Sequence, residues 1–141
     1  MQILFDTNII LDFLGKREPF SENANALIRL CDAGVITGCI AAHVIPDVFY
    51  ILRKQYTVDV RRSILIDLCE ILFVIGINSQ TLISALQNED FSDFEDCLQD
   101  ECANAIGARY IVTRNPKDFL KSKVPTIDPT DLLKLFLSES D

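Results

Sequence analysis

Short apolar runs alternate with segments of helical periodicity along almost the whole chain, and this alternation limits the folds open to it. A short apolar run is typical of a strand buried on both faces of a parallel sheet. Parallel strands need crossover connections, and the helical segments between the runs can supply them. Strands are therefore expected at residues 2–6, 37–41, 72–75, 110–113 and 124–127.

The helical segments follow from apolar spacing and from helix start and stop residues. Ser21 and Ser79 are predicted to be helix N-caps, and a loop or short helix is expected at 115–119. Helices are expected at residues 8–15, 22–33, 43 or 44 to 55, 59–70, 80–87, 93–106 and 130–137. The pattern predicts an α/β fold: one domain over residues 1–141, a three-layer α/β/α sandwich with a central parallel sheet of four to five strands.

Composition excludes several classes of protein. The net charge of −8 argues against a dedicated DNA-binding protein, which is usually basic. The five cysteines form no CxxC pair and are expected to be reduced core residues of a cytoplasmic protein. The N-terminus lacks the features of a signal peptide, and no stretch reaches the roughly 18–20 apolar residues of a membrane span.

The first polar motif is Asp6-Thr7-Asn8, which directly follows the first apolar run. The carboxyl end of a strand is where an open α/β sheet places its ligands. The same residues also suit ordinary capping of the helix that follows, and both interpretations remain open at this point.

Asp47 stands in the otherwise apolar first half of a predicted helix. An acid in a first turn is favourable for the helix dipole, which is the simpler explanation. Because its neighbours are apolar, the side chain is also expected to face into the fold, where an unpaired carboxylate needs a metal ion or a proton.

The helix predicted at 93–106 is strongly acidic. Asp93, Asp96 and Asp100 are spaced to lie along one face of it. A solvated acidic face is the usual reason for such a run. Small residues follow on this helix, which suits close packing on the sheet instead. A further strand end carries Thr113, Asn115 and Asp118, a pattern that is also compatible with a polar turn.

These motifs are individually weak, but strand ends of one parallel sheet lie at the same edge. Two carboxylates about 4 Å apart repel by about 4 kcal/mol at an effective dielectric constant of about 20. A cluster of acids there requires protons or a hard divalent cation. Oxygen ligands without His or Cys favour Mg²⁺ or Mn²⁺ over zinc.

In order and spacing, the four motifs resemble the PIN-domain family, of which VapC-like toxin ribonucleases are numerous members. The motifs are ILFDTN from residue 3, DVFYILRK from residue 47, DFEDCLQ from residue 93 and IVTRNPKDF from residue 111. The resemblance covers nearly the whole chain. It implies a Mg²⁺- or Mn²⁺-dependent endoribonuclease that cuts single-stranded RNA, with a parallel sheet between layers of helices.

The resemblance also implies roles for individual residues. Asp6 and Asp96 match family metal ligands, and Asp47 stands where most members have glutamate. Asn115 stands where many members have a fourth aspartate, with Asp118 as the nearest acid able to replace it. The residues expected to line or brace the site are Thr7, Asn8, Thr113 and Asp93.

Two departures from the family pattern affect the expected metal site. Asp47 is one methylene shorter than glutamate, and Asn115 removes a negative charge. Together they favour one tightly held metal ion, or a second ion bound only with substrate. A shared ion would activate a water molecule, so no side-chain nucleophile is needed. His43 is interpreted as a helix-start or surface residue rather than a general base.

An acidic protein that cuts RNA has to place its few cations near the site. The candidates for RNA binding are Lys16, Arg17, Arg53, Lys54, Arg114 and Lys117, whereas Arg61 and Arg62 are interpreted as a solvated helix face.

The resemblance further implies a small antitoxin partner and a homodimer. Candidate contact surfaces are residues 44–52 and the apolar side chains Leu132, Leu133, Leu135 and Phe136, which are equally suited to covering the core. Two alternatives remain: a catalytically weak or inactive PIN-like binding or scaffold module, and a phosphohydrolase with Asp6 as nucleophile. The second fits less well because Asn8 stands where its motif needs aspartate.

Overall fold

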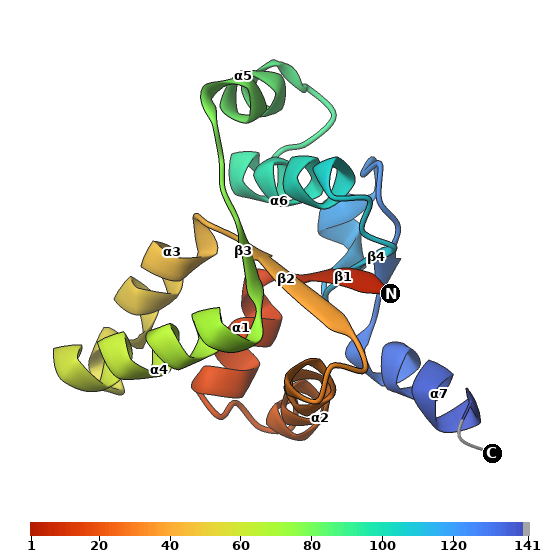
Figure 1. Ribbon diagram of the computed structural model, residues 1–141. Coiled ribbons are helices and arrows are strands. Elements are labelled where there is room, and N and C mark those ends of the chain that lie inside the picture. The colour runs from red at the N-terminus through yellow and green to blue at the C-terminus, as the bar shows by residue number, and fades with distance from the viewer. Residues whose placement is uncertain (140–141) are drawn as a thin grey trace.

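Five parallel strands form one sheet in the order β3-β2-β1-β4-β5, with β1 at its centre (Figure 1). The computed structural model describes residues 1–139. The strands are β1 (Gln2–Phe5), β2 (Thr37–Ala41), β3 (Phe73–Ile75), β4 (Tyr110–Val112) and β5 (Thr126–Ile127). The predicted parallel sheet of four to five strands is therefore confirmed.

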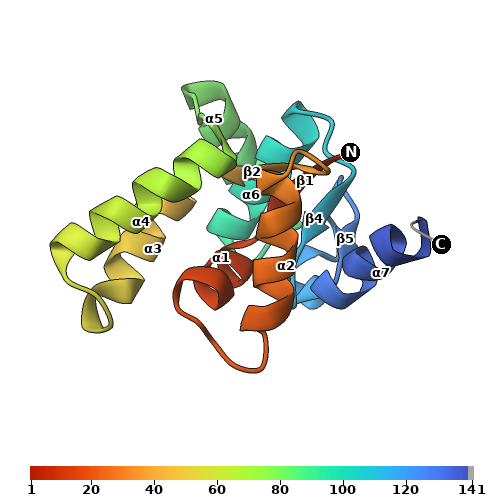
Figure 2. The same ribbon diagram turned by 60° about the horizontal axis from the view of Figure 1, so that its bottom comes forward.

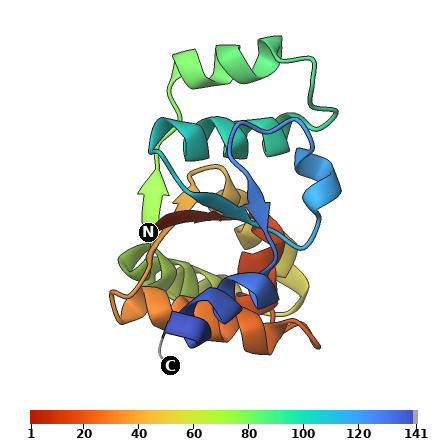
Figure 3. The same ribbon diagram turned by 90° about the vertical axis from the view of Figure 1, so that its right-hand side faces the viewer.

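Helices cover both faces of this sheet, as predicted for an α/β/α sandwich. Helices α5 and α6 lie on one face, and α1, α2, α4 and α7 lie on the other (Figure 3). The helices are α1 (Thr7–Leu14), α2 (Ser21–Asp32), α3 (Val44–Ile51), α4 (Val58–Ile71), α5 (Ser79–Gln87), α6 (Phe94–Ala105) and α7 (Pro129–Glu139). Two 3-10 helices, η1 (Leu52–Lys54) and η2 (Pro116–Phe119), follow α3 and β4.

The order of the strands creates a crevice beside β1. The chain moves outward from β1 to β2 and β3, with α1 to α4 on one face, and then crosses back through α5 and α6 to β4 (Figure 2). Right-handed crossovers that run in opposite directions place their helices on opposite faces. The direction reverses between β1 and β4, and ligands of open α/β sheets bind outside the strand ends at such a point.

The first strand is buried on both faces because helices pack on each side of it. Ile3, Leu4 and Phe5 have no solvent exposure. Close packing extends to the neighbouring strand at Gly38, where a Cβ atom would lie 2.6 Å from the Cys31 sulfur and 2.9 Å from the Phe5 ring. Any larger residue at this position would push the sheet away from α2 and thereby displace the end of β1.

The predicted N-caps Ser21 and Ser79 are wrong by one residue. Asn78 caps α5, because its Oδ1 accepts a hydrogen bond from the Thr81 N–H at 3.0 Å. Phe20 occupies the cap position of α2 with helical backbone angles, and the Ser21 hydroxyl donates instead to Glu18. Each serine is thus the first residue of its helix rather than the cap.

The interpretation of Arg61 as a surface residue is also wrong. Its side chain is buried, and its guanidinium donates to the Phe49 and Tyr56 carbonyls and stacks on the Phe49 ring. Arg61 therefore ties α4 to the end of α3.

All five cysteines are free, and four of them are buried while Cys69 is exposed. Across residues 1–139, none of the helices combines the length and the apolar character that crossing a bilayer requires.

Candidate functional site

A cleft of about 470 Å³ opens at the carboxyl ends of β1 and β4, where the strand order reverses. Six acids line it, together with three amides, one hydroxyl and three apolar or aromatic side chains. The lining residues are Asp6, Thr7, Asn8, Leu11, Asp47, Tyr50, Ile51, Asp93, Glu95, Asp96, Gln99, Asn115 and Asp118. The cleft thus contains all five residues predicted to be catalytic, although they are spread over 113 positions of the sequence.

Asp6 is the most firmly held of these acids. It follows β1, is 6% exposed, and its backbone N–H donates to the Val112 carbonyl of β4. Its Oδ1 accepts hydrogen bonds from the Thr7 N–H and the Gln99 amide, and its Oδ2 accepts one from the Thr113 hydroxyl, each at 2.7 Å. A carboxylate has about four acceptor positions, so these three donors leave one on Oδ2 for a ligand.

The capping interpretation of Asp6 is therefore correct as well, since its bond to the Thr7 N–H begins α1. The Asp6 carboxylate thus caps α1 and also lines the cleft.

Asp96 lies in the first turn of α6, where the positive end of the helix dipole favours an acid. Asp93 is the N-cap of this helix, and its Oδ1 accepts from the Asp96 N–H at 3.0 Å. Burial, and after it the charges of Asp93, Asp6, Asp118 and Glu95, together raise the pKa of Asp96 to about 7. Asp96 is consequently an acid that a cation would strongly stabilise in its charged form.

Asp47 reaches the cleft from α3, on the opposite side from α6. Burial raises the pKa of Glu95, and the charge of Asp47 raises it as well. His43 precedes the same helix at its cap position, which confirms its placement at a helix start. Both of its ring nitrogens are buried without a hydrogen-bond partner, and burial lowers its pKa against the opposing effect of Asp47.

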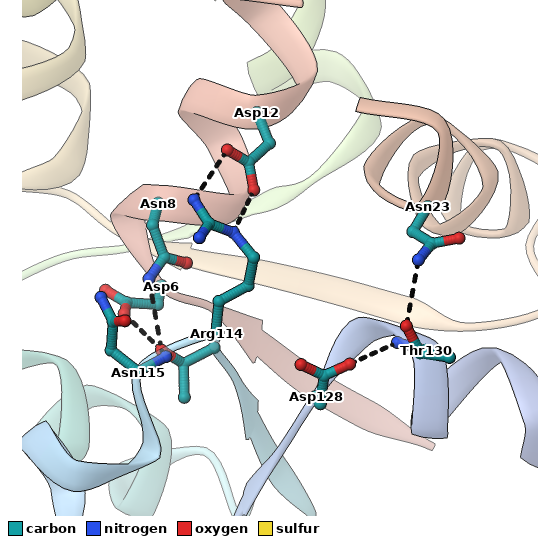
Figure 4. Close-up of polar contacts among 9 residues, drawn as sticks. Asp6, Asn8, Asp12, Asn23, Arg114, Asn115, Asp128 and Thr130 are labelled. Atoms are coloured by element: carbon teal, nitrogen blue, oxygen red, sulfur yellow. Dashed lines mark hydrogen bonds and ion pairs between the residues drawn. The ribbon is translucent and has the colours of Figure 1, made fainter. Parts of the chain in front are cut away.

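The loop after β4 completes the cleft and is anchored by two sets of contacts. The Thr113 hydroxyl, besides bonding Asp6, accepts from the Asn115 N–H at 3.0 Å and from the Asn8 amide at 3.4 Å. Arg114 turns the other way, toward α1, where it forms a two-pronged ion pair with Asp12 (Figure 4). Asn115 and Asp118 line the cleft from this loop.

The predicted RNA-binding residues lie outside the cleft lining. Within the described part of the chain no lysine or arginine lines the cleft, so its charge comes from acids alone. Arg53 contacts a lining residue, because its guanidinium stacks 3.9 Å from the centre of the Tyr50 ring. Arg114 is committed to Asp12 and to the ring of Phe20. Lys16 and Arg17 follow α1, Lys54 lies in η1 and Lys117 in η2.

The acidic face predicted for the helix at 93–106 divides into two parts. Asp93 and Asp96 line the cleft, whereas Asp100 has no exposure and accepts from the Lys123 and Val124 N–H groups. Prediction from sequence missed Gln99 and Glu95 as lining residues. The available signal for Gln99 was its position three residues after Asp96, on the same side of the helix.

The model of the PIN domain matches residues 2–117. The chain belongs to the PIN-domain family. The matched range includes every residue that lines the cleft except Asp118. None of the curated proteins compared with the chain matches it.

Several solved structures have the same fold as this chain. A chain of VapBC2 from Rickettsia felis, solved with promoter DNA, has a TM-score of 0.65 at 18% identity, over 91% of this chain and 98% of that one. A chain of DNA-bound VapBC from Salmonella typhimurium has a TM-score of 0.67 at 16% identity, over 92% and 98%. VapC20 from Mycobacterium tuberculosis, a toxin that cleaves the sarcin-ricin loop, has a TM-score of 0.61 at 14% identity, over 77% and 86%.

Proposed function

We propose that this PIN-domain protein is a Mg²⁺- or Mn²⁺-dependent endoribonuclease that hydrolyses single-stranded RNA, and that it is the toxin of a toxin–antitoxin pair. The observation that carries the proposal is a cluster of six acids in one cleft at the switch point of the sheet, lined by no lysine or arginine of the described chain. Such a cluster repels itself unless a cation joins it.

The residues of the cleft suit a hard divalent ion, because carboxylates and amides, whose oxygens such an ion prefers, line it together with Asp6. Asp6, Asp96 and Asp47 would hold the ion, directly or through water. Among the described residues no three acidic, His or Cys side chains already converge closely enough to hold a metal ion, so loading requires the acids to turn inward. When bound, the ion supplies an activated water molecule and offsets charge on the phosphate.

Backbone and side-chain groups of the protein position the acids for this reaction. Thr7, Thr113 and Gln99 hold Asp6 in one orientation, and Asp93 holds the start of the helix that carries Asp96. Asn115 and Asp118 face the same cleft from the loop after β4, where they can orient water or a phosphate oxygen. The short reach of Asp47 and the neutral Asn115 favour one ion over two.

Features of the cleft rim support an RNA strand as the substrate. Tyr50 is 62% exposed and Ile51 is 42% exposed, and both line the cleft. The stack of Arg53 on Tyr50 adds a cation to the same edge. Unpaired bases bind to exposed aromatic rings, and Arg contributes to the backbone charge balance. The remaining predicted RNA-binding residues would act beyond the rim.

An antitoxin is the proposed protein partner, and the similarity to VapBC assemblies supports this. We also propose a homodimer and a cytoplasmic location. Of the two predicted contact surfaces, α7 packs Leu132 fully into the core, whereas α3 leaves Tyr50 and Ile51 exposed.

A cleavage assay tests the proposal. Single-stranded RNA is incubated with the protein and with Mg²⁺, Mn²⁺ or EDTA, alongside Asp6→Asn prepared in the same way. Asp67→Asn, an exposed acid of α4, serves as the matched control. We expect cleavage by the wild type and the control only with a metal ion, and none by Asp6→Asn. Cleavage in EDTA, or equal cleavage by Asp6→Asn, would refute the proposal.

A further inference from the structure

Gln99 is buried beneath the acid cluster and has two different ends. The residue is 1% exposed and lies in α6, one turn after Asp96. Its amide nitrogen donates to Asp6 Oδ1 at 2.7 Å, whereas its amide oxygen, also buried, has no hydrogen-bond partner. Because a carboxylate only accepts, the NH₂ end has to face Asp6, and the orientation of the amide is thereby settled.

A buried amide oxygen without a partner is uncommon in folded proteins. The neighbours of Gln99 in the chain are an apolar Leu98 and the fully engaged Asp100. The Gln99 oxygen is closed to bulk solvent, yet the side chain lines the cleft. A partner of the Gln99 oxygen would therefore have to come from the cleft.

Water and a divalent ion differ in how closely they approach the Gln99 oxygen. A water molecule approaches an oxygen to about 2.8 Å, whereas Mg²⁺ binds oxygen at about 2.0–2.1 Å. A small divalent ion therefore needs less room beside an oxygen atom than a water molecule does. The adjoining Asp6 carboxylate retains one free acceptor position on Oδ2, so both groups can serve the same ion.

We propose that Gln99 is a further ligand of the divalent ion, with its nitrogen holding Asp6 and its oxygen bound to the ion. This inference rests on the proposed function, because it presumes that the cleft binds Mg²⁺ or Mn²⁺. A neutral oxygen adds a ligand without adding repulsion to six neighbouring acids. It also compensates for the short reach of Asp47 and the missing charge at Asn115.

The test is isothermal titration of the metal-free protein with Mn²⁺ alone at pH 8. Gln99→Met has a similar length and removes both polar ends. Gln99→Glu keeps an oxygen at the position but removes the NH₂ group. Asp100→Asn is the matched control, since it alters a buried acid of the same helix whose partners are backbone N–H groups outside the cleft. Melting in EDTA checks that each variant is folded.

We expect Gln99→Met to bind Mn²⁺ about 10- to 100-fold more weakly than the wild type. Gln99→Glu should bind at least as tightly as the wild type, and Asp100→Asn should bind like it despite a lower melting temperature. The increase in melting temperature caused by Mn²⁺ should shrink in Gln99→Met and be retained in Gln99→Glu, a contrast that loss of the NH₂ group alone would not produce.

Three results would overturn the inference. Equal binding by Gln99→Met excludes a ligand role, and weak binding by both Gln99 variants assigns the whole effect to the NH₂ group. A wild type that binds no Mn²⁺ refutes the proposed function itself, and this outcome is distinguished by the wild-type titration alone.

Discussion

Two groups of acids in this protein differ in the partners that surround them. Asp12 is 1% exposed and pairs with both guanidinium prongs of Arg114, at 2.7 and 3.0 Å. Asp100 is fully buried and accepts from the Lys123 and Val124 N–H groups at 3.0–3.1 Å. In the cleft, by contrast, Asp96 faces four other acids, and its pKa is raised to about 7.

This contrast separates the acids that stabilise the fold from the acids that await a ligand. A buried charge is costly unless a partner compensates it, and Asp12 and Asp100 have such partners within the chain. The cleft acids oppose one another, and their repulsion lowers the stability of the empty protein. We infer that their compensating partner is a ligand, which is the physical basis of the proposed metal site.

The largest expected effect is on RNA cleavage, which should depend on Asp96 but not on Asp100 of the same helix. Asp96→Asn should reduce metal-dependent RNA cleavage at least about 100-fold, because losing even an indirect partner of a metal ion costs 10- to 100-fold. Asp100→Asn should retain cleavage and lose stability. Initial rates and melting curves of both variants measure this, and similar losses of activity would break the comparison.

The Asp12–Arg114 pair predicts the largest effect on stability. Asp12→Asn should lower the free energy of unfolding by about 2 kcal/mol, because it leaves the Arg114 guanidinium without its counter-charge. The value is below that of a fully buried pair because Arg114 is 22% exposed. Urea unfolding in EDTA measures it, and an unchanged midpoint would contradict a scaffold role for Asp12.

Asp96 should make the metal-free protein less stable as the pH rises. The unfolded carboxyl has a pKa of about 3.9, and the folded one has a pKa of about 7. Between these values the folded state binds more protons, so the free energy of unfolding falls with increasing pH.

The measurement is urea unfolding in EDTA at pH 5 and pH 8 for the wild type and Asp96→Asn. The wild type should lose about 1 kcal/mol more than the variant over this range, after allowance for solvent screening of the half-exposed group. Parallel pH profiles for the two proteins would show that Asp96 titrates normally.

The smallest effect concerns the rim of the cleft. Arg53→Gln should weaken single-stranded RNA binding and lower the slope of log affinity against log salt by about 1, because one phosphate contact is lost. Lys117→Gln gives a comparison at another predicted RNA-binding position. Filter binding in Ca²⁺ at several salt concentrations measures the slopes, and an unchanged slope for Arg53→Gln removes it from the interface.

The sheet and the convergence of the acids were predictable because they follow from local patterns. Apolar runs that end in Asp6 and Thr113 mark strand ends, and parallel topology brings such ends to one edge. Asp47 was predictable as an acid in the first turn of an otherwise apolar helix, and Asp96 was predictable from its spacing with Asp93 along one helix face.

The partners of the acids were not predictable, because they come from distant segments. Asp100 has the spacing of a cleft residue, but a loop 23 residues later supplies its N–H donors. Arg114 resembles an RNA-binding residue beside Asn115, yet Asp12 engages it from 102 positions away. Gln99 gives little local signal, since an amide within a helix is usually exposed.

Thermal unfolding of the wild-type protein in EDTA and in excess Mn²⁺ shows most directly whether the cleft acids form a cation site. If the cleft acids form a cation site, Mn²⁺ at about 100 times its Kd should add about 2.7 kcal/mol to the free energy of unfolding and raise the melting temperature by several degrees. Asp96→Asn should show little of this increase. The same wild-type melting temperature with and without Mn²⁺ would contradict the account.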